Sequence, residues 1–378
     1  HWEVVHRSLK ETYLFILSVS GTKMLIHYRE LMHDLAQRFS DFAKSFEKGA
    51  PLYSRIAARV AEEPAVLELM SVAPIAQRIP VLLFASAHYL LLDNRDHELA
   101  QHYPNIASTA PTGDVADLFV AFVLKRSGAM KELLANRSTQ TNEIGRCNWF
   151  LFPFAILDAE VGAIAQVDVG SSAGLNQLFP NLGFDLNPGG LIGEHAALTI
   201  ACDITGAPLV VTDRPQVIWS MGLDAKPIDV RNDAEVRWLE ACVWPDQVER
   251  FDRLQRAIAL ARHHNIVVER GDAVDDVAQA IERGAKHGHP VVTTSWVLNY
   301  LSPERRIAFV HELDRVGTER DLSWVIAESP YETPELPGHR ESDELITVIT
   351  LVTWRIGQRS VQRLATTHPH GQWIHWGN

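Results

Sequence analysis

The chain is poor in cysteine, in positive charge and in long hydrophobic runs. Its 378 residues include three cysteines, at positions 147, 202 and 242, and no C-x-x-C motif. Neither a disulfide framework nor a cysteine zinc site is therefore expected. The formal net charge of -12 at pH 7 opposes a phosphate-neutralising surface and so a nucleic-acid partner. These absences favour a small-molecule substrate and a reducing, cytoplasmic compartment.

The hydrophobic stretch from Tyr13 to Gly21 is too short to span a bilayer. It is similar to a signal-peptide core, but no small-x-small cleavage site stands out, so an ordinary buried helix is the preferred interpretation. We expect no membrane partner and leave homodimer formation open. The chain length, with 46% hydrophobic and 22% charged residues, predicts a sizeable core in two domains.

The sequence changes character near residue 160. Before it, apolar residues such as Leu31, Leu35 and Phe39 recur at three- and four-residue steps, which is typical of amphipathic helices. After it, β-branched runs such as NIVVER (265–270) and PVVTTSWVL (290–298) alternate with helical stretches. We predict an all-helical domain over 1–150, followed by an α/β domain over 151–378. The α/β domain should contain a mostly parallel sheet that ends in an antiparallel pair.

The segment AIAQVDVGSSAGLNQLF (163–179) can be interpreted in two ways. Residues 170–174 spell G-x-S-x-G, the serine hydrolase elbow, with Ser172 as nucleophile. Glu328 and either His368 or His370 follow in the order that a catalytic triad requires. An elbow strand lies in mid-sheet, however, and the chain has neither earlier strands nor an upstream H-G-G-G oxyanion loop.

The second interpretation is a nucleotide-binding turn. Asp168 ends the first strand, small residues form the turn, and a helix is expected to begin near Leu175 with its free amides facing a ligand. This segment resembles the acid-x-Gly-x-Gly-x-Gly motif of class I S-adenosylmethionine-dependent methyltransferases, with Ser172 in place of the middle glycine. The resemblance implies a Rossmann-like methyltransferase core and S-adenosylmethionine as cofactor. It assigns cofactor contacts to Asp168, Gly170, Ser171, Ser172 and Gly174.

Two further strand ends continue this resemblance. Asp224 in GLDAKPIDV (222–230) would accept hydrogen bonds from both ribose hydroxyls. Asp185 lies at a more usual spacing and competes for that role; if Asp224 holds it, an inserted hairpin-like segment occupies about 180–215. Asp272 would accept from the adenine amino group while the Ala273 amide meets the ring. Asp272 is equally suited to capping the helix that follows.

The methyl-transfer site is expected after the fourth parallel strand. There Ser295 would lie under the methyl donor, and Trp296 and Asn299 would contact the acceptor. A base, where the acceptor needs one, is assigned to Glu328, Tyr300 or Glu143. The Asn/Asp-Pro-Pro-aromatic sequence of enzymes that methylate exocyclic or amide nitrogen is absent, which disfavours a base or glutamine acceptor.

Polar residues also gather in TQTNEIGR (139–146). Asn142 and Arg146 would cap a substrate cleft, with Arg146 clamping a carboxylate or phosphate, or would form a hydrogen-bonded joint between domains. His368 and His370 lie two residues apart, but no third ligand stands at a recognisable spacing. No metal site is therefore predicted, and His370 is assigned to the substrate.

The whole chain also resembles an uncharacterised bacterial family that joins a helical region to a core of this kind. Stretches such as VGSSAGLN (169–176) and HPHGQWIHWG (368–377) carry this likeness. The function expected is methyl transfer from S-adenosylmethionine to a small or medium-sized acceptor. The alternatives are a ligand-binding module without transfer activity, and a serine hydrolase or acyltransferase that uses Ser172.

Overall fold

The computed structural model describes residues 29–107, 114–330 and 346–377. The stretch from Tyr13 to Gly21 lies outside these residues. Within them, no helix is both long and apolar enough to cross a membrane. Internal contacts divide the chain into two compact units, unit 1 with 1–140 and 240–251, and unit 2 with 141–239 and 252–378.

All regular elements among the described residues of unit 1 are helices. Its elements are a helix over 29–45, α2 (Pro51–Ala61), α3 (Pro64–Leu69), η1 (Met70–Val72), η2 (Ile75–Gln77), α4 (Pro80–Leu92), η3 (Glu98–His102), α5 (Val115–Lys125) and α6 (Ser127–Asn136). Proline begins α2, α3 and α4, where its missing N–H is not needed. Asp114 caps α5 by accepting from the amide of Ala116 at 2.8 Å. The helices therefore begin where the sequence has prolines and a capping acid.

Helix α4 has the largest share of buried residues among α2 to α6. Most of its residues are buried, as expected for a helix that is apolar on all sides. Its single histidine, His88, contacts the Ala241 carbonyl oxygen and the Asn105 amide, each at 3.1 Å. Burial lowers the pKa of His88 to about 4, so this histidine is neutral in the folded protein at neutral pH.

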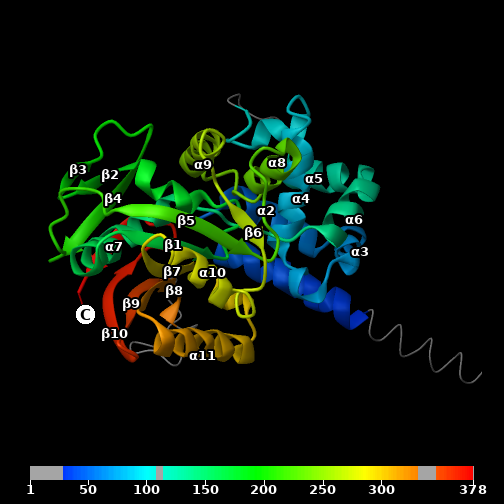
Figure 1. Ribbon diagram of the computed structural model, residues 1–378. Helices are drawn as coiled ribbons and strands as arrows, with labels where there is room; N and C mark the ends of the chain where they lie inside the picture. The colour runs from blue at the N-terminus through cyan, green and yellow to red at the C-terminus, as the bar shows by residue number, and fades with distance from the viewer. Residues whose placement is uncertain (1–28, 108–113, 331–345, 378) are drawn as a thin grey trace, which may run out of the picture. The chain divides into compact units, whose positions relative to one another are not determined.

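Unit 2 is built on an eleven-stranded mixed sheet (Figure 1). Its strands are β1 (Ile164–Val169), β2 (Leu182–Asn187), β3 (Gly190–Ile192), β4 (Leu198–Gly206), β5 (Val217–Asp224), β6 (Val268–Arg270), β7 (His289–Ser295), β8 (Leu322–Glu328), β9 (Thr347–Arg355), β10 (Gln358–Thr367) and β11 (Trp373–Trp376). Their order is β3-β2-β4-β11-β10-β9-β8-β7-β1-β5-β6. The block from β6 to β8 is parallel, whereas β8 to β11 pair antiparallel. This confirms the predicted α/β class with a mostly parallel sheet.

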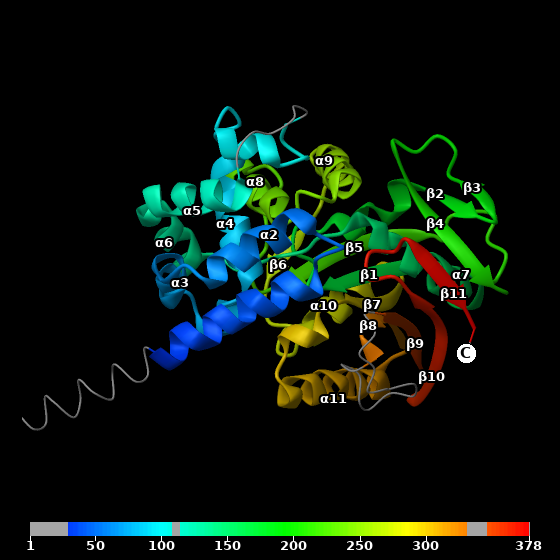
Figure 2. The same ribbon diagram turned by 180° about the vertical axis from the view of Figure 1, so that it is seen from behind.

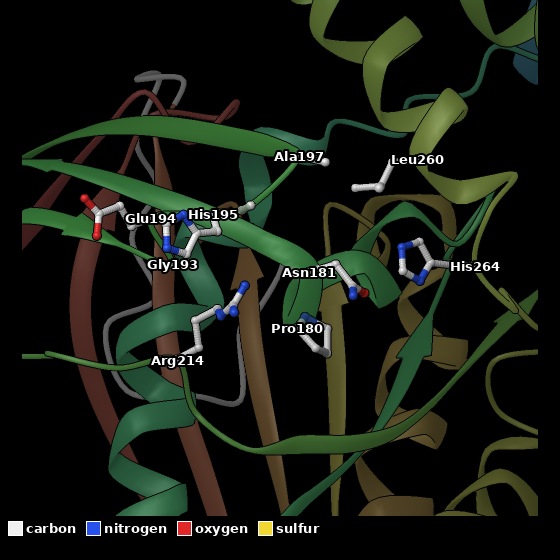
Figure 3. Close-up of a pocket in the computed structure, with 10 residues that line it drawn as sticks. Pro180, Asn181, Gly193, Glu194, His195, Ala197, Arg214, Leu260 and His264 are labelled. Atoms are coloured by element: carbon white, nitrogen blue, oxygen red, sulfur yellow. The ribbon is translucent and has the colours of Figure 1, made fainter.

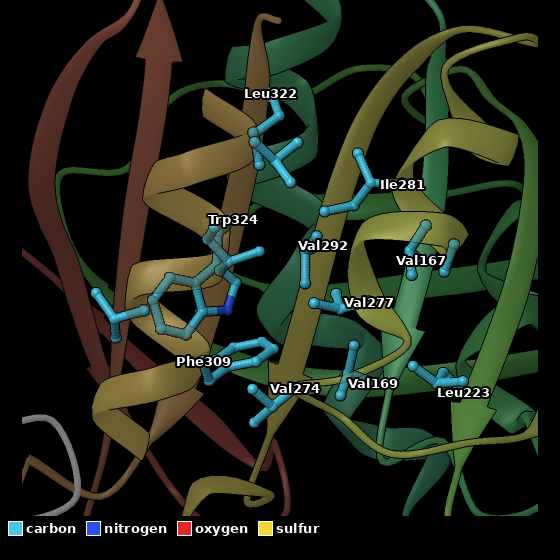
Figure 4. Packing of buried hydrophobic residues seen from close by; sticks show 14 of the residues in the cluster. Val167, Val169, Leu223, Val274, Val277, Ile281, Val292, Phe309, Leu322 and Trp324 are labelled. Atoms are coloured by element: carbon cyan, nitrogen blue, oxygen red, sulfur yellow. The ribbon is translucent and has the colours of Figure 1, made fainter. Parts of the chain in front are cut away.

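Helices cover the parallel block. Those of unit 2 are η4 (Ile144–Cys147), α7 (Asn148–Val161), η5 (Leu175–Asn181), α10 (Val277–Gly284), η6 (Leu298–Tyr300) and α11 (Pro303–Glu319), while α8 (Asp233–Ala241) and α9 (Val248–Ala261) each continue into unit 1. Helices α10 and α11 pack on one face of the sheet, where Val167, Val292 and Trp324 meet Ile281 and Phe309 (Figure 4). Figures 1 and 2 show this layer from its two sides. Strands β1 and β8 are buried along their whole length, as parallel strands between two layers are.

The link between β1 and β5 differs from the predicted one. The element that begins at Leu175 is a seven-residue 3₁₀ helix that leads directly into β2, not an α-helix. Strands β2 and β3 form a hairpin, and β4 pairs with β2 and with β11. The segment at about 180–215 therefore extends the far end of the same sheet, and Asp185 on β2 lies many strands away from β1 and β5.

Gly317 of α11 tests the close packing of this helix on the sheet. A Cβ added there would lie 2.2 Å from Cδ1 of the buried Trp354, whose Nε1 donates to Asp314 at 2.9 Å. Gly317→Ala should lower the free energy of unfolding by ~1–3 kcal/mol because the helix must move from the sheet. Gly128 lies in α6, and a Cβ added there would meet open space. Gly128→Ala should therefore leave the free energy of unfolding unchanged or raise it slightly. Calorimetric unfolding of both variants checks this, and equal effects would contradict the packing argument.

Candidate functional site

The carboxyl ends of β1 and β7 mark the place where the strand order changes direction. From β1 the chain goes to β5 and β6 on one side and to β7 and β8 on the other. In open parallel sheets, ligands bind in the crevice outside the strand ends at such a point. The loops that follow these two strands are therefore the first place to look for a site.

Both loops contain a strained residue. Among the described non-glycine residues, positive φ angles occur at Ser172 (52°), Trp296 (58°) and Ile356 (52°). Ile356 lies in the turn between β9 and β10, where positive φ is usual. Ser172 follows β1 and Trp296 follows β7, and such a conformation costs about 1–3 kcal/mol unless the surroundings enforce it. Backbone strain of this kind is concentrated at functional sites.

The loop after β1 is held from several sides. The Ser172 amide donates to Asp224 Oδ2 at 2.7 Å, and the Gly170 amide donates to the Leu223 carbonyl at 2.8 Å. A Cβ on Gly170 would lie 2.4 Å from Val297, and one on Gly174 would lie 2.6 Å from Ile266. Both glycines also have positive φ. The two glycines are therefore required by the packing of the protein itself.

Asp168 lies at the end of β1 and is fully buried. Thr293 Oγ1 on β7 donates to Oδ1 at 2.7 Å, and Asn176 Nδ2 donates to Oδ2 at 3.2 Å. Burial raises the pKa of Asp168 to about 7, although these hydrogen bonds and Arg146 act in the opposite direction. Burial therefore favours the neutral form of this carboxyl far more than in an exposed aspartate.

Glu328 is the equivalent group at the end of β8. Its carboxyl accepts from the amide of Val297 at 3.0 Å and from that of Leu298 at 3.3 Å, and Thr294 provides a side-chain hydrogen bond. Burial raises the pKa of Glu328 to about 8. The carboxyl fixes the backbone just after the strained Trp296, and burial favours its protonated form.

Arg146 brings a buried positive charge to both carboxyl groups. It lowers the pKa of Asp168 and of Glu328 against the larger effect of burial. Its Nη1 donates to the Ser295 carbonyl at 3.0 Å, its Nε donates to the Pro369 carbonyl at 3.3 Å, and its guanidinium lies 5.3 Å from the Trp149 ring centroid. We call Asp168, Glu328, Arg146 and their hydrogen-bonding neighbours Asn176 and Thr293 the strand-end cluster.

Residues 142–148 pack along this cluster. Asn142 Oδ1 accepts from the Leu175 amide at 3.1 Å, which caps η5. Glu143 Oε1 accepts from Arg253 Nη2 at 3.0 Å and from the Gly145 amide at 3.0 Å. Within unit 2 these residues are therefore fixed by hydrogen bonds to η5 and to α9, and both the substrate-cleft role and the joint between domains stay predictions.

The other predicted residues lie apart from the buried carboxyls or have partners of their own. Trp296 Nε1 donates to Thr347 Oγ1 at 2.7 Å, while Asn299 and Tyr300 are exposed on η6. The His370 amide donates to His368 Nδ1 at 3.2 Å. No group of three or more acidic, histidine or cysteine side chains in the described part of the chain could hold a metal ion.

Asp272 caps the turn that precedes α10, whereas the N-cap position of the helix itself is Asp276. Oδ1 of Asp272 accepts from the amides of Val274 and Asp275, at 2.7 and 3.1 Å, and forms an ion pair with Arg305. Ala273 follows Asp272 in this capping turn. The carboxylate of Asp272 is thus held by the turn before α10 and by Arg305 of α11.

A cavity of about 310 Å³ opens next to the loop after β1. Its walls include Ala173 of that loop, the segment from Pro227 to Arg231 after β5, and Val268 of β6. The Ile228 amide donates to the Ser172 carbonyl at 3.1 Å, which joins two of these walls. The cavity has the size of a small-molecule site.

Two residues of the strand-end cluster and the partner of Glu143 were not identified from the sequence. Asn176 and Thr293 hold Asp168, and Arg253 pairs with Glu143. The two adjacent threonines in PVVTTS were the available signal. Neighbouring strand residues face opposite sides of a sheet, so this pair places one buried hydroxyl on each side, where each can bind a buried polar group. Nothing near Arg253 in the sequence indicates its partner, which lies 110 residues earlier.

The raised pKa values predict a stability that depends on pH. Below about pH 4 the carboxyl of Glu328 is protonated in both states. Between there and pH 8 the folded state keeps a proton that the unfolded chain loses, so stability falls as pH rises. Glutamine does not titrate, so Glu328→Gln should not lose stability in this way. The free energy of unfolding of the variant minus that of the wild type should therefore increase from pH 5 to pH 8, by at most about 1.4 kcal/mol for each unit by which folding raises the pKa of Glu328.

Urea unfolding at several pH values measures this difference. Glu319→Gln, at an exposed acid that pairs with Arg315 on the surface, serves as the control and should change little with pH. A difference between Glu328→Gln and wild type that stays constant across this range would show that Glu328 is ionised in the folded protein.

One family model matches residues 36–376, nearly the whole chain, and its description is "Uncharacterized protein conserved in bacteria (DUF2332)". No curated protein and no solved structure matches the chain. The match confirms the likeness of the whole chain to an uncharacterised bacterial family. Because the family model covers the helices of unit 1 as well as the sheet and the strand-end cluster of unit 2, the chain belongs to the DUF2332 family.

Proposed function

We propose that the protein is an S-adenosylmethionine-dependent methyltransferase with a Rossmann-like core that acts on a small or medium-sized acceptor. The observation that carries this proposal is the strand order β6-β5-β1-β7-β8 with strained loops at its reversal. With the strands numbered by their order in the parallel block, this is the 3-2-1-4-5 order of nucleotide-binding sheets. The motifs after β1 and β5 add the resemblance to methyltransferases.

The loop and Asp224 offer suitable groups for this cofactor. Asp224 uses one oxygen for Ser172 and the other for the Lys226 amide, and each carboxylate oxygen can accept a further bond from a ribose hydroxyl. The amides of Ser171 and Ala173 have no hydrogen-bond partner among the described residues and would hold the methionine carboxylate. The Ser171 hydroxyl is likewise buried without a partner. The adjacent 310 Å³ cavity would receive the nucleoside.

When bound, the cofactor supplies an electrophilic methyl carbon. The protein has to orient the acceptor and exclude water. Ser295, Trp296 and Asn299 are proposed to line the acceptor side. Burial raises the pKa of Glu328 to about 8, so this carboxyl is suited to act as a base only at higher pH, and the exposed Tyr300 is the other base to test. Glu143 is held by Arg253 and is the weakest of the three proposed bases.

Calorimetric titration with S-adenosylmethionine and S-adenosylhomocysteine tests the cofactor. Asp224→Asn should weaken both by roughly tenfold or more, because it removes the charge that accepts from the ribose. Asp233→Asn makes the same charge change at an acid that is 91% exposed and should leave binding unchanged. Absence of binding by a folded wild-type sample would overturn the proposal. Binding without transfer to any acceptor would favour the binding-module alternative.

The strain at Ser172 also supports the second candidate, a serine hydrolase, because an elbow nucleophile lies on a strained turn after a strand. The expected triad partners have other contacts, since Glu328 accepts backbone amides and His368 accepts from His370. Hydrolysis is therefore the less supported function.

Ser172→Gly separates the two functions. A glycine adopts φ of 52° without strain and leaves more space for a cofactor. We therefore expect the free energy of unfolding of Ser172→Gly to equal that of the wild type or to exceed it by up to about 1 kcal/mol. The methyltransferase proposal also predicts that the variant binds S-adenosylhomocysteine more tightly. Labelling by an active-site serine probe that Ser172→Gly abolishes would instead support the hydrolase.

A further inference from the structure

A second, larger cavity lies beside the inserted strands of unit 2. It encloses about 400 Å³. Its walls come from the end of η5, the turn between β3 and β4, the approach to β5 and the end of α9, and Figure 3 shows the residues that line it. It shares His264 with the cavity beside the loop after β1, but it contains no residue of the strand-end cluster.

Arg214 supplies the positive charge of this cavity. Its Nη1 donates to the Leu182 carbonyl at 2.9 Å, and a Cβ on Gly193 would lie only 3.2 Å from the same nitrogen. The guanidinium therefore lies against the backbone of Gly193. A side chain at this position would crowd the guanidinium, and the φ angle of +74° also favours glycine. Arg214 forms no ion pair with any described residue. Four of its five N–H groups are left to bind something else.

The other polar side chains of the wall are also mostly donors or neutral groups. His195, His264 and Asn181 line the cavity with Arg214 (Figure 3). Glu194 is the one acid of the wall, and its exposed side chain extends away from Arg214 in Figure 3. A half-buried guanidinium without an ion pair, in a cavity wall that also contains two imidazoles, is an environment for an anion.

We propose that this cavity binds the phosphate group of a small phosphorylated molecule. A tetrahedral phosphate has enough oxygens to accept several of the N–H groups that Arg214 leaves free and a bond from a second donor of the wall, whereas a carboxylate has two. The volume of about 400 Å³ exceeds what phosphate alone fills and leaves room for the rest of a small ligand. The proposal rests on the residues of this cavity and does not depend on the methyltransferase assignment.

Titration with inorganic phosphate, and separately with acetate, tests this site. Histidine ring resonances in the NMR spectrum, assigned with His195→Gln, report on this cavity, because His195 lines it and not the cavity beside the loop after β1. Phosphate should shift the His195 resonance saturably, and acetate should bind at least tenfold more weakly. Arg214→Gln should weaken phosphate binding by roughly tenfold or more, because a charge-assisted pair is lost.

Two further variants control for folding and charge. Ala197 is exposed in the cavity wall, so Ala197→Glu adds a repelling carboxylate without breaking the Arg214 to Leu182 bond and should also weaken phosphate. Arg315→Gln removes a surface charge that pairs with Glu312 and Glu319 and should have no effect. No saturable shift, or equal phosphate binding by wild type, Arg214→Gln and Ala197→Glu, would overturn the proposal. Acetate binding as tight as that of phosphate would overturn the phosphate assignment.

Discussion

The removal of two carboxyl groups from water is the constraint on which the strand-end region of unit 2 depends. Asp168 and Glu328 are each about 1% exposed, and a buried carboxylate is costly unless it is hydrogen-bonded, paired or protonated. The protein uses all three means. Thr293 of β7 donates a hydrogen bond to Asp168, and the adjacent Thr294 donates one to Glu328. Backbone amides also donate to Glu328, and Arg146 lies near both carboxyls with its positive charge. The positions of β1, β7, β8 and residues 142–148 are tied together by this need.

The same constraint shapes the loops. Glu328 holds the amides directly after Trp296, and Asp224 holds the amide of Ser172, so each strained residue has a carboxyl fixing its backbone. Val297 fills the space over Gly170 and brings the two loops into contact. A loop held in this way is preorganised, and a ligand that binds it loses little conformational entropy from the protein.

Much of the fold follows from patterns that extend over a few residues. Continuous apolar runs predict the buried strands β1, β7 and β8, and the helices of unit 1 begin at Pro51, Pro64 and Pro80. The acids at the strand ends were also found, because strand and turn are local features. What the sequence does not reveal depends on distant contacts, such as β4 pairing with β11 or 240–251 grouping with the helices of unit 1. The 3₁₀ form of η5 has a similar cause, since Pro180 and the immediate entry into β2 leave no room for an α-helix.

The central claim is that the loop after β1 and the segment after β5 form a cofactor site. Hydrogen exchange measured by mass spectrometry, with and without S-adenosylhomocysteine, tests it most directly because it localises the ligand without substitutions. The account predicts slower exchange in peptides that cover 169–176 and 224–231, and unchanged exchange in α11. Unchanged exchange in both of those peptides at saturating ligand, or protection confined to other parts of the chain, would contradict it.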